Sequence, residues 1–345
     1  MSEPSPSIRY EFGFRPQPGE AMEILPGIRW LHLPLPFVLN HINTWVLDDD
    51  DEYLLVDTGF YTGVTRDIWK EVLAGLPGGK PVTRVLVTHL HPDHVGCAGW
   101  LCERLDAELL MTREEYLLCR ILVADTGQPA PEEGKRFYRA AGFSERQLSR
   151  YTKHFGSFGQ VVSDLPQAYF RLHDGMELDI GTNRWRVIIG NGHSLEHACL
   201  YCEELNVLIS GDQVLPTISS NVGVWPTEPG ASPLADWFAS LRHLMQVLPD
   251  DVLVLPSHGK PFRGVKHRLN ELIAEHEDCL EKLRELCREP RRAVDIFPVL
   301  FKGEVNEDNL IMAVSEAIAH LNYLLHEGEI SVDTNGDGVH WYRIQ

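Results

Sequence analysis

Short apolar runs alternate with longer stretches of helical period over the first two thirds of the chain. The runs RVLVTH, RWRVIIGNGH, NVLISGD and DVLVLPSHG are typical of buried strands, and each ends on a polar segment that contains His or Asp. Mixed α/β folds place their chemistry at strand ends, so these four ends are candidate site segments.

Helical patterns lie between and after these runs. Ser232 and Pro233 are typical of a helix start, and an apolar stripe from Leu234 to Leu248 predicts a helix with one buried face. Residues 111–170 also have a helical pattern and lack strand signals. We therefore expect a helical insertion between strands of the main sheet region.

The pattern changes near residue 264. A long charged helix over 265–288, a short one over 293–301 and a third over 307–327 are predicted, the last ending at Gly328. Two strand-like runs separated by Asn335-Gly336 then predict a terminal hairpin with a tight turn. Helices followed by a hairpin are typical of a small winged-helix module.

Composition narrows the class of protein. The 345 residues are 43% hydrophobic and 23% charged, which indicates a globular chain rather than a disordered or coiled-coil one. No apolar run of 18 residues is present and the first twenty residues contain no signal-peptide core, so we expect no membrane association and a cytoplasmic location. The net charge of −19 disfavours nucleic-acid partners.

The seven cysteines are scattered, as is typical of reduced, mostly buried thiols. Cys199 and Cys202 have a C-x-x-C spacing that binds zinc in other contexts. Here the pair lies within an apolar strand-like run with no turn residue, so a structural role is favoured.

The segment THLHPDHVG, residues 88–96, carries the clearest chemistry. It places three imidazoles and a carboxylate within six residues after a buried strand, which predicts a metal site. Three other strand ends supply the same types of ligand. Together the candidate ligands are His89, His91, Asp93, His94, His193, Asp212 and His258. Five imidazoles and two carboxylates suffice for two metal ions with one bridging carboxylate.

With these signatures in order, and with Asp57 in LLVDTG before them, the sequence resembles the metallo-β-lactamase-fold hydrolase superfamily. The resemblance implies a four-layer αββα sandwich over 20–264, with a helical insertion at about 111–170. It assigns His89, His91 and His193 to one metal, and Asp93, His94 and His258 to the other, with Asp212 bridging. Asp57 is expected to orient the metal-binding loop rather than to bind an ion.

The resemblance extends, less strongly, to the C-terminal stretch. Residues 265–345 resemble the winged-helix extension of beta-lactamase-like hydrolases, which include a mitochondrial endoribonuclease. The full dinuclear ligand set looks like the glyoxalase II, lactonase and nuclease branches. The third signature departs from the usual G-H-S-P-G-H and has G-H-S-L-E-H, so that His197 is expected to be a packed strand histidine.

This ligand set predicts a metal-dependent hydrolase in which metal-bound hydroxide attacks the carbonyl of an ester, thioester or lactone. Asp93 is expected to hold the proton of the hydroxide. The cofactors would be two divalent ions, with Zn²⁺ favoured and iron or manganese compatible with the same ligands. Serine-nucleophile and nucleotide-binding motifs are lacking in the sequence.

The substrate is predicted to be small and partly apolar. Eight Phe and Tyr residues between 137 and 170 indicate either the core of the helical insertion or an apolar lid over the metals. Trp225 could form another wall of the pocket. His41 and Asn43 are candidates for substrate contact, with a structural role in a turn as the alternative.

The alternative function is a metal-dependent endoribonuclease acting on single-stranded RNA. Residues 290–345 contain four Lys and Arg against nine Asp and Glu, whereas a nucleic-acid-binding wing should be basic. Charge therefore favours the small-molecule hydrolase, and the C-terminal module is expected to pack on the catalytic domain or to form a homodimer contact.

Overall fold

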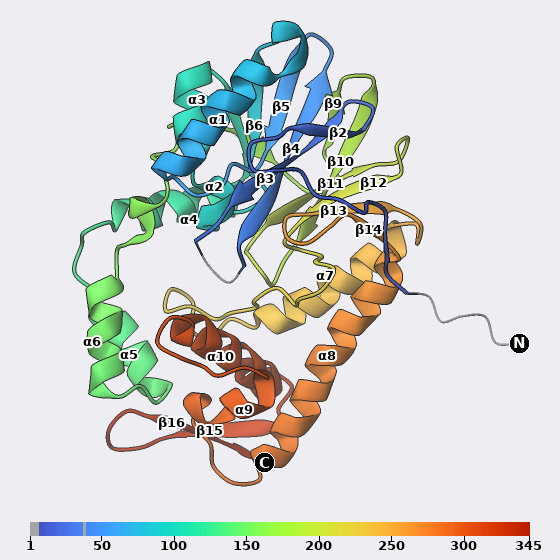
Figure 1. Ribbon diagram of the computed structural model, residues 1–345. Coiled ribbons are helices and arrows are strands. Elements are labelled where there is room, and N and C mark those ends of the chain that lie inside the picture. Colours follow the sequence, from blue (N-terminus) through green and yellow to red (C-terminus); the bar gives the residue numbers. More distant parts are fainter. Residues whose placement is uncertain (1–6, 37–38) are drawn as a thin grey trace, which may run out of the picture.

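Two seven-stranded sheets form the upper part of the molecule in the computed structural model, which describes residues 7–36 and 39–345 (Figure 1). One sheet has the order β2 (Met22–Leu25), β3 (Ile28–Pro34), β4 (His41–Asp49), β5 (Glu52–Val56), β6 (Val82–Leu86), β7 (Glu108–Thr112) and β8 (Phe170–Leu172). The other has the order β1 (Arg9–Tyr10), β14 (Phe262–Arg263), β13 (Leu253–Pro256), β12 (Val207–Gly211), β11 (His197–Cys202), β10 (Asn183–Gly190) and β9 (Glu177–Ile180).

The alternation of side chains along each strand explains why the sheets stack. In β4, Trp45 and Leu47 belong to the apolar core between the two sheets, whereas Ile42 and Val46 belong to the core under the first sheet's helices. Successive side chains of a strand point to opposite faces, so β4, which has apolar side chains on both faces, packs against a core on each side.

Helices cover the outer face of each sheet. Helices α1 (Gly63–Gly75), α3 (Ala98–Leu105) and α4 (Arg113–Ala124) contact the first sheet, and α7 (Pro233–Val247) contacts β10 of the second. A four-residue helix, α2 (Pro92–Val95), follows β6. The predicted four-layer arrangement is confirmed. Ser232 is the N-cap of α7 as predicted, although its hydroxyl makes no capping hydrogen bond.

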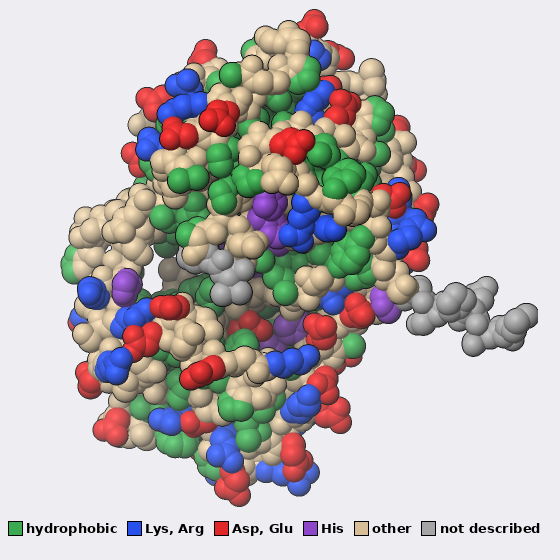
Figure 2. All heavy atoms as spheres, viewed as in Figure 1, with side chains coloured by type: hydrophobic (Ala, Val, Ile, Leu, Met, Phe, Trp, Pro, Cys, Tyr) green, Lys and Arg blue, Asp and Glu red, His purple; other side chains and the backbone are tan. Residues whose placement is uncertain are grey.

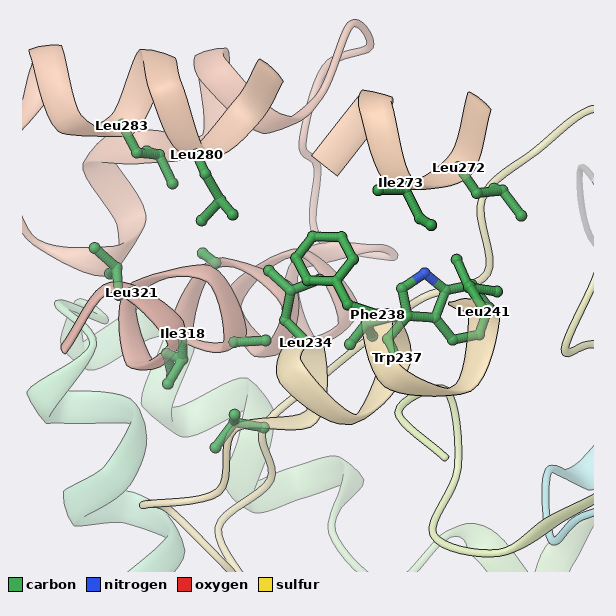
Figure 3. Close-up of a cluster of buried hydrophobic side chains, with 14 of the residues drawn as sticks. Leu234, Trp237, Phe238, Leu241, Leu272, Ile273, Leu280, Leu283, Ile318 and Leu321 are labelled. Atoms are coloured by element: carbon green, nitrogen blue, oxygen red, sulfur yellow. The ribbon is translucent and has the colours of Figure 1, made fainter. Parts of the chain in front are cut away.

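The C-terminal region packs below the sandwich in Figure 1. Helix α8 (Val265–Leu286) leads to a 3₁₀ turn (Ala293–Ile296), α9 (Phe297–Leu300), α10 (Leu310–His326) and the hairpin of β15 (Ile330–Thr334) and β16 (His340–Ile344). Figure 3 shows side chains of α7, α8 and α10 in one cluster. The C-terminal helices therefore share a core with α7, the helix that covers the second sheet. Each buried Leu, Ile or Phe in this core contributes about 1.5–3 kcal/mol to the stability of the fold.

The predicted hairpin is confirmed, but the prediction of a tight turn at Asn335-Gly336 is wrong. The two strands are joined by the longer loop 335–339, in which the Asn335 side chain accepts hydrogen bonds from the backbone of Asp337 and Val339. The positive φ of the loop falls on Gly338 (φ 79°) rather than on Gly336.

The helical insertion contains α4, α5 (Glu132–Ala140), α6 (Glu145–His154) and a 3₁₀ turn at Phe158–Gln160. Helices α5 and α6 extend away from the sandwich and lie beside the C-terminal helices (Figure 1). Their buried side chains Tyr138, Phe143 and Leu148 join the same core as α7, α8 and α10. Arg146 and Arg150 pair with Glu307 before α10.

Candidate metal centre

Parallel strand pairs bring the sequence-predicted ligands to one edge of the sandwich. Strands β5 and β6 are parallel, and so are β12 and β13. Asp57 follows β5 and His89 lies three residues beyond β6, while Asp212 and His258 follow β12 and β13. Because parallel strands end at the same edge, side chains far apart in the sequence converge there.

Three imidazoles form the first group. The Nε2 atom of His89 lies 2.9 Å from Nδ1 of His91 and 3.2 Å from Nε2 of His193. Burial, followed by the neighbouring His193, lowers the pKa of His91 to about 3. The ring nitrogens therefore converge as neutral imidazoles, which is the protonation state that binds a metal.

The second group contains Asp93, His94 and His258. Nε2 of His258 lies 3.3 Å from the Asp93 carboxylate, and Nε2 of His94 lies 3.7 Å from it. Asp93 and His94 come from the single turn of α2, and Pro92 at its first position starts that turn. The Asp93 side chain is 17% exposed, the most open carboxylate of the cluster.

Asp212 lies between the two groups. One carboxylate oxygen is 3.5 Å from Nε2 of His94 and 3.6 Å from Nε2 of His193, and the other is 3.4 Å from Nε2 of His258. A carboxylate in contact with ligands of both groups is in the position that a bridging ligand requires. We call the seven converging residues His89, His91, Asp93, His94, His193, Asp212 and His258 the strand-end cluster.

Unpartnered polar atoms show that the strand-end cluster fits divalent cations. Nε2 of His94 and one carboxylate oxygen of Asp212 are fully buried and have no hydrogen-bond partner. Such atoms are costly unless a ligand satisfies them. Imidazole nitrogens and carboxylate oxygens together suit zinc, iron or manganese.

The charges of the strand-end cluster lead to the same conclusion. Burial lowers the pKa of His94, but the carboxylates of Asp57, Asp212 and Asp93 outweigh burial and hold this pKa well above its usual value. In the same way Asp212 outweighs burial at His258 and raises its pKa to about 10. The carboxylates thus create a site that demands positive charge, which bound cations would supply.

Asp57 contacts the strand-end cluster through the ring of His94. Its carboxylate lies 2.8 Å from Nδ1 of His94 and accepts hydrogen bonds from the backbone and the hydroxyl of Thr88. Asp57 has a left-handed backbone (φ 61°), which few residues other than Gly, Asn and Asp adopt readily. Asp57 thus contacts His94, a candidate ligand, as expected for a residue that orients a metal ligand.

Comparison with known proteins now identifies the family. Residues 38–258, well over half of the chain, match the model described as "Metallo-beta-lactamase superfamily". The chain belongs to the metallo-beta-lactamase superfamily. Residues 280–345 match a second model, "Metallo-beta-lactamase-like, C-terminal domain". The predicted resemblance is confirmed, and the two matches cover most of the sandwich and of the C-terminal helices.

Solved structures agree with this superfamily fold. A beta-lactamase domain protein from Burkholderia ambifaria is 40% identical, with a TM-score of 0.90 and coverage of 98% of both chains. A metallo-beta-lactamase family protein from Thermus thermophilus is 31% identical, with a TM-score of 0.72, over 94% of this chain and all of that one.

Curated relatives of this superfamily protein include hydrolases. The probable metallo-hydrolase YqjP of Bacillus subtilis is 25% identical over 90% of this chain and 96% of its own length. An atrochrysone carboxyl ACP thioesterase of Aspergillus fumigatus is 24% identical over 90% of this chain, which spans 62% of that relative. The family and these relatives indicate a metal-binding hydrolase. Within the described residues, no helix is long and apolar enough to cross a membrane.

Two candidate substrate residues of this superfamily protein have structural roles instead. The amide of Asn43 is fully buried and makes hydrogen bonds to Trp30, Pro256 and Gly259, so substrate contact is not supported. His41 is 5% exposed, and its ring nitrogens contact Asn40 and the Gly259 backbone. The backbone oxygen of His41 accepts from Nδ1 of His258, so the backbone of His41 holds the ring of a candidate ligand.

Glu115 of α4 is a site residue that the sequence did not reveal. It is fully buried, and its carboxylate accepts hydrogen bonds from the Leu90 backbone, the Glu196 backbone and the Ser194 hydroxyl. These contacts join the loop of His89 and His91 to the loop of His193. Glu114 and Glu115 both lie in the first turn of α4, and nothing in the sequence indicates which of them has such a role.

His197 packs within the strand, as expected. Its Nε2 accepts from the Asp212 backbone, and a Cβ on Gly211 (φ 51°) would lie 2.4 Å from that nitrogen, so Gly is required there. Cys199 and Cys202 lie in different cores, on opposite faces of β11. The C-x-x-C pair therefore cannot bind one ion.

The structure favours the core interpretation of the insertion's aromatic residues over the apolar lid. Tyr138 and Phe143 are buried in the same core as the C-terminal helices. The rings of Tyr116 and Tyr169 stack, with their centroids 3.8 Å apart. Trp225, in the loop between β12 and α7, is 39% exposed and stays a candidate for substrate contact.

Proposed function

We propose that the protein is a dinuclear metal-dependent hydrolase that cleaves an ester, thioester or lactone of a small, partly apolar substrate. The observation that carries the proposal is Asp212, whose two oxygens face ligands of both histidine groups while one of them has no hydrogen-bond partner. When bound, the cations, which we take to be Zn²⁺, supply Lewis-acid polarisation of a carbonyl and lower the pKa of water.

The residues of the chain perform the remaining tasks. Asp57, Glu115 and the backbone of His41 fix the orientation of the ligands, so no reorganisation is needed during the reaction. Asp93 is the most open carboxylate of the strand-end cluster, and we assign it the role of holding the proton of the attacking water at its Oδ2 atom.

Apolar side chains on the loops that carry the ligands support an acyl substrate. Leu195 follows His193 by two residues and is 41% exposed. Ile218, in the loop after Asp212, is 43% exposed, and Trp225 lies further along the same loop. Exposed apolar residues near a site are typical of ligand-binding surfaces. The thioesterase among the relatives supports the same substrate class.

Charge argues against the endoribonuclease alternative. Acidic and basic side chains are interspersed over the face in Figure 2, which is hollowed between the sandwich and the C-terminal helices and carries no continuous basic band. The net charge of −19 repels a phosphate backbone.

We further propose a division of the chain at Gly264 into a catalytic domain (20–264) and a winged-helix-like domain (265–345), the latter packing on the former or forming a homodimer contact. The β15–β16 hairpin after three helices supports this assignment.

The proposal is tested with a series of acyl thioesters and esters at two ionic strengths, beside a single-stranded RNA. We expect kcat/KM to rise severalfold per added methylene until the pocket is full, because each buried CH₂ contributes about 0.8 kcal/mol. Trp225→Ala should reduce this gain, and Ile344→Ala, on the exposed edge of β16, should not. RNA cleavage faster than hydrolysis of every ester would overturn the proposal.

A further inference from the structure

A second cluster of metal-binding side chains lies between the C-terminal helices. His276 comes from α8, and Glu316 and His320 lie one turn apart on α10. The two histidines are 4% and 1% exposed. One ligand atom from each of the three residues lies within 4.8 Å of the others. We call these residues the helix cluster; neither the sequence patterns nor the proposed catalytic chemistry accounts for it.

The spacing of its imidazoles is close to that of the strand-end cluster. Nδ1 of His276 lies 3.1 Å from Nε2 of His320. In the strand-end cluster the corresponding nitrogens of His89 lie 2.9 Å from His91 and 3.2 Å from His193. Two nitrogens bound tetrahedrally to one zinc ion, each at about 2.0–2.1 Å, are separated by a similar distance.

Each residue of the helix cluster is also held by a second contact on its outer side. Nδ1 of His320 lies 2.9 Å from the Glu316 backbone oxygen, and Nε2 of His276 lies 3.0 Å from the Ser219 hydroxyl. The Glu316 carboxylate accepts from the Asn221 amide at 2.7 Å. Metal-binding histidines characteristically have the other ring nitrogen held by a carbonyl or a hydroxyl in this way.

The charges of the helix cluster match a cation. Burial lowers the pKa of His276 to about 3 and that of His320 to about 4, so both rings are neutral ligands. Among the described residues, no basic side chain forms an ion pair with Glu316, and burial raises the pKa of its carboxyl to about 7. Two neutral imidazoles and an unpaired carboxylate form a donor set for a divalent ion.

We propose that His276, Glu316 and His320 bind a divalent cation of the zinc type, which fastens α8 and α10 to the loop that contains Ser219 and Asn221. That loop continues to the strand-end cluster, because the Asn221 backbone oxygen lies 2.8 Å from Nδ1 of His193. The cation would therefore have a structural role and would connect the C-terminal helices to a ligand of the catalytic cluster. This site supplies no reacting group and would affect the reaction of the strand-end cluster only through Asn221 and His193.

The experiment measures zinc bound per chain when the strand-end cluster is disabled. A full-length variant with His89→Ala, Asp93→Ala and Asp212→Ala is freed of metal, dialysed against Zn²⁺ and analysed for metal, with circular dichroism as the check of folding. We expect one equivalent of zinc, lost when Glu316→Gln or His320→Gln is added and retained with His326→Ala, on the exposed end of α10. A folded variant that binds no zinc, or binds it regardless of Glu316 and His320, would overturn the proposal.

A second measurement covers the case in which the multiple variant does not fold. In the otherwise unaltered protein, Glu316→Gln preserves the shape of the side chain and an oxygen for the Asn221 amide. We expect it to bind one zinc equivalent fewer and to lose part of the rise in melting temperature on adding Zn²⁺. Unchanged stoichiometry would show that the two histidines form only a neutral hydrogen-bonded pair, against the proposal.

Discussion

The strand-end cluster and the helix cluster use the same types of ligand, but different elements of the fold carry them. The strand-end cluster lies at strand ends and on the short helix α2, and it contains two carboxylates, Asp93 and Asp212. The helix cluster is built on two packed helices and has one carboxylate, Glu316. The two clusters thus differ in their number of carboxylates and in the elements that carry them.

The largest loss of activity is expected from a substitution at the centre of the strand-end cluster. Asp212→Ala should lower hydrolytic activity more than about a hundredfold, beyond the losses that follow from removing an orienting residue. The repulsion between two cations would then lack a bridging charge, so binding at both positions should weaken. Activity and metal content are measured together, with Asp333→Ala on the exposed β15 as the control. Turnover close to that of the unaltered protein would show that Asp212 does not bridge.

A smaller effect, on metal affinity, is expected from substitution of Asp57, which contacts His94 of the strand-end cluster. Asn tolerates the left-handed backbone of Asp57 and can still accept from the Thr88 backbone, so Asp57→Asn should fold. It removes the charge beside Nδ1 of His94, and we expect about a 10–100-fold loss of metal affinity. Competition with a chelator measures this affinity. An unaltered affinity would mean that His94 is oriented without Asp57.

Glu115→Gln should have a milder effect on the same cluster. One of its two acceptor oxygens becomes an amide donor, so at least one contact to the loops of His91 and His193 is lost. We expect about a tenfold decrease in metal affinity. Glu114→Gln, at the exposed neighbouring position, is the matched control. Equal effects of the two substitutions would contradict a positioning role for Glu115.

The smallest effect on catalysis should come from the helix cluster. Glu316 acts on His193 only through Asn221, so Glu316→Gln should lower kcat/KM by no more than about tenfold. The measurement is steady-state kinetics on the thioester that serves for Asp212→Ala. A loss as large as that from Asp212→Ala would remove the distinction between a catalytic cluster and a structural one.

The sandwich and its candidate metal ligands were predictable because their signals are local. Apolar runs that end on His or Asp predicted the strands, and the H-x-H-x-D-H spacing predicted that four ligands would converge. The helix cluster was not predictable, since His276 and His320 are far apart in the sequence and lie within apolar helical stripes. Which residues of such stripes face each other is decided by helix packing.

Substrate-facing residues were also beyond the sequence. Asn43 and His41 precede the first ligands in the sequence and resemble residues at the rim of a site. In the structure, however, their side chains make hydrogen bonds to the backbone of Pro256 and Gly259, at and just after the end of β13. The aromatic residues of the insertion are apolar enough for a lid, yet the C-terminal helices offer them a larger apolar surface. Sequence periodicity identifies a buried face without revealing which surface buries it.

Titration of metal-free protein with Zn²⁺, with hydrolysis of an acyl thioester followed at each point, tests the central claim most directly. Activity is predicted to be absent without metal and to appear as cations fill the strand-end cluster, with no activity in Asp212→Ala at any zinc concentration that saturates the unaltered protein. Full turnover by the metal-free protein, or thioester hydrolysis independent of Asp212, would contradict the account.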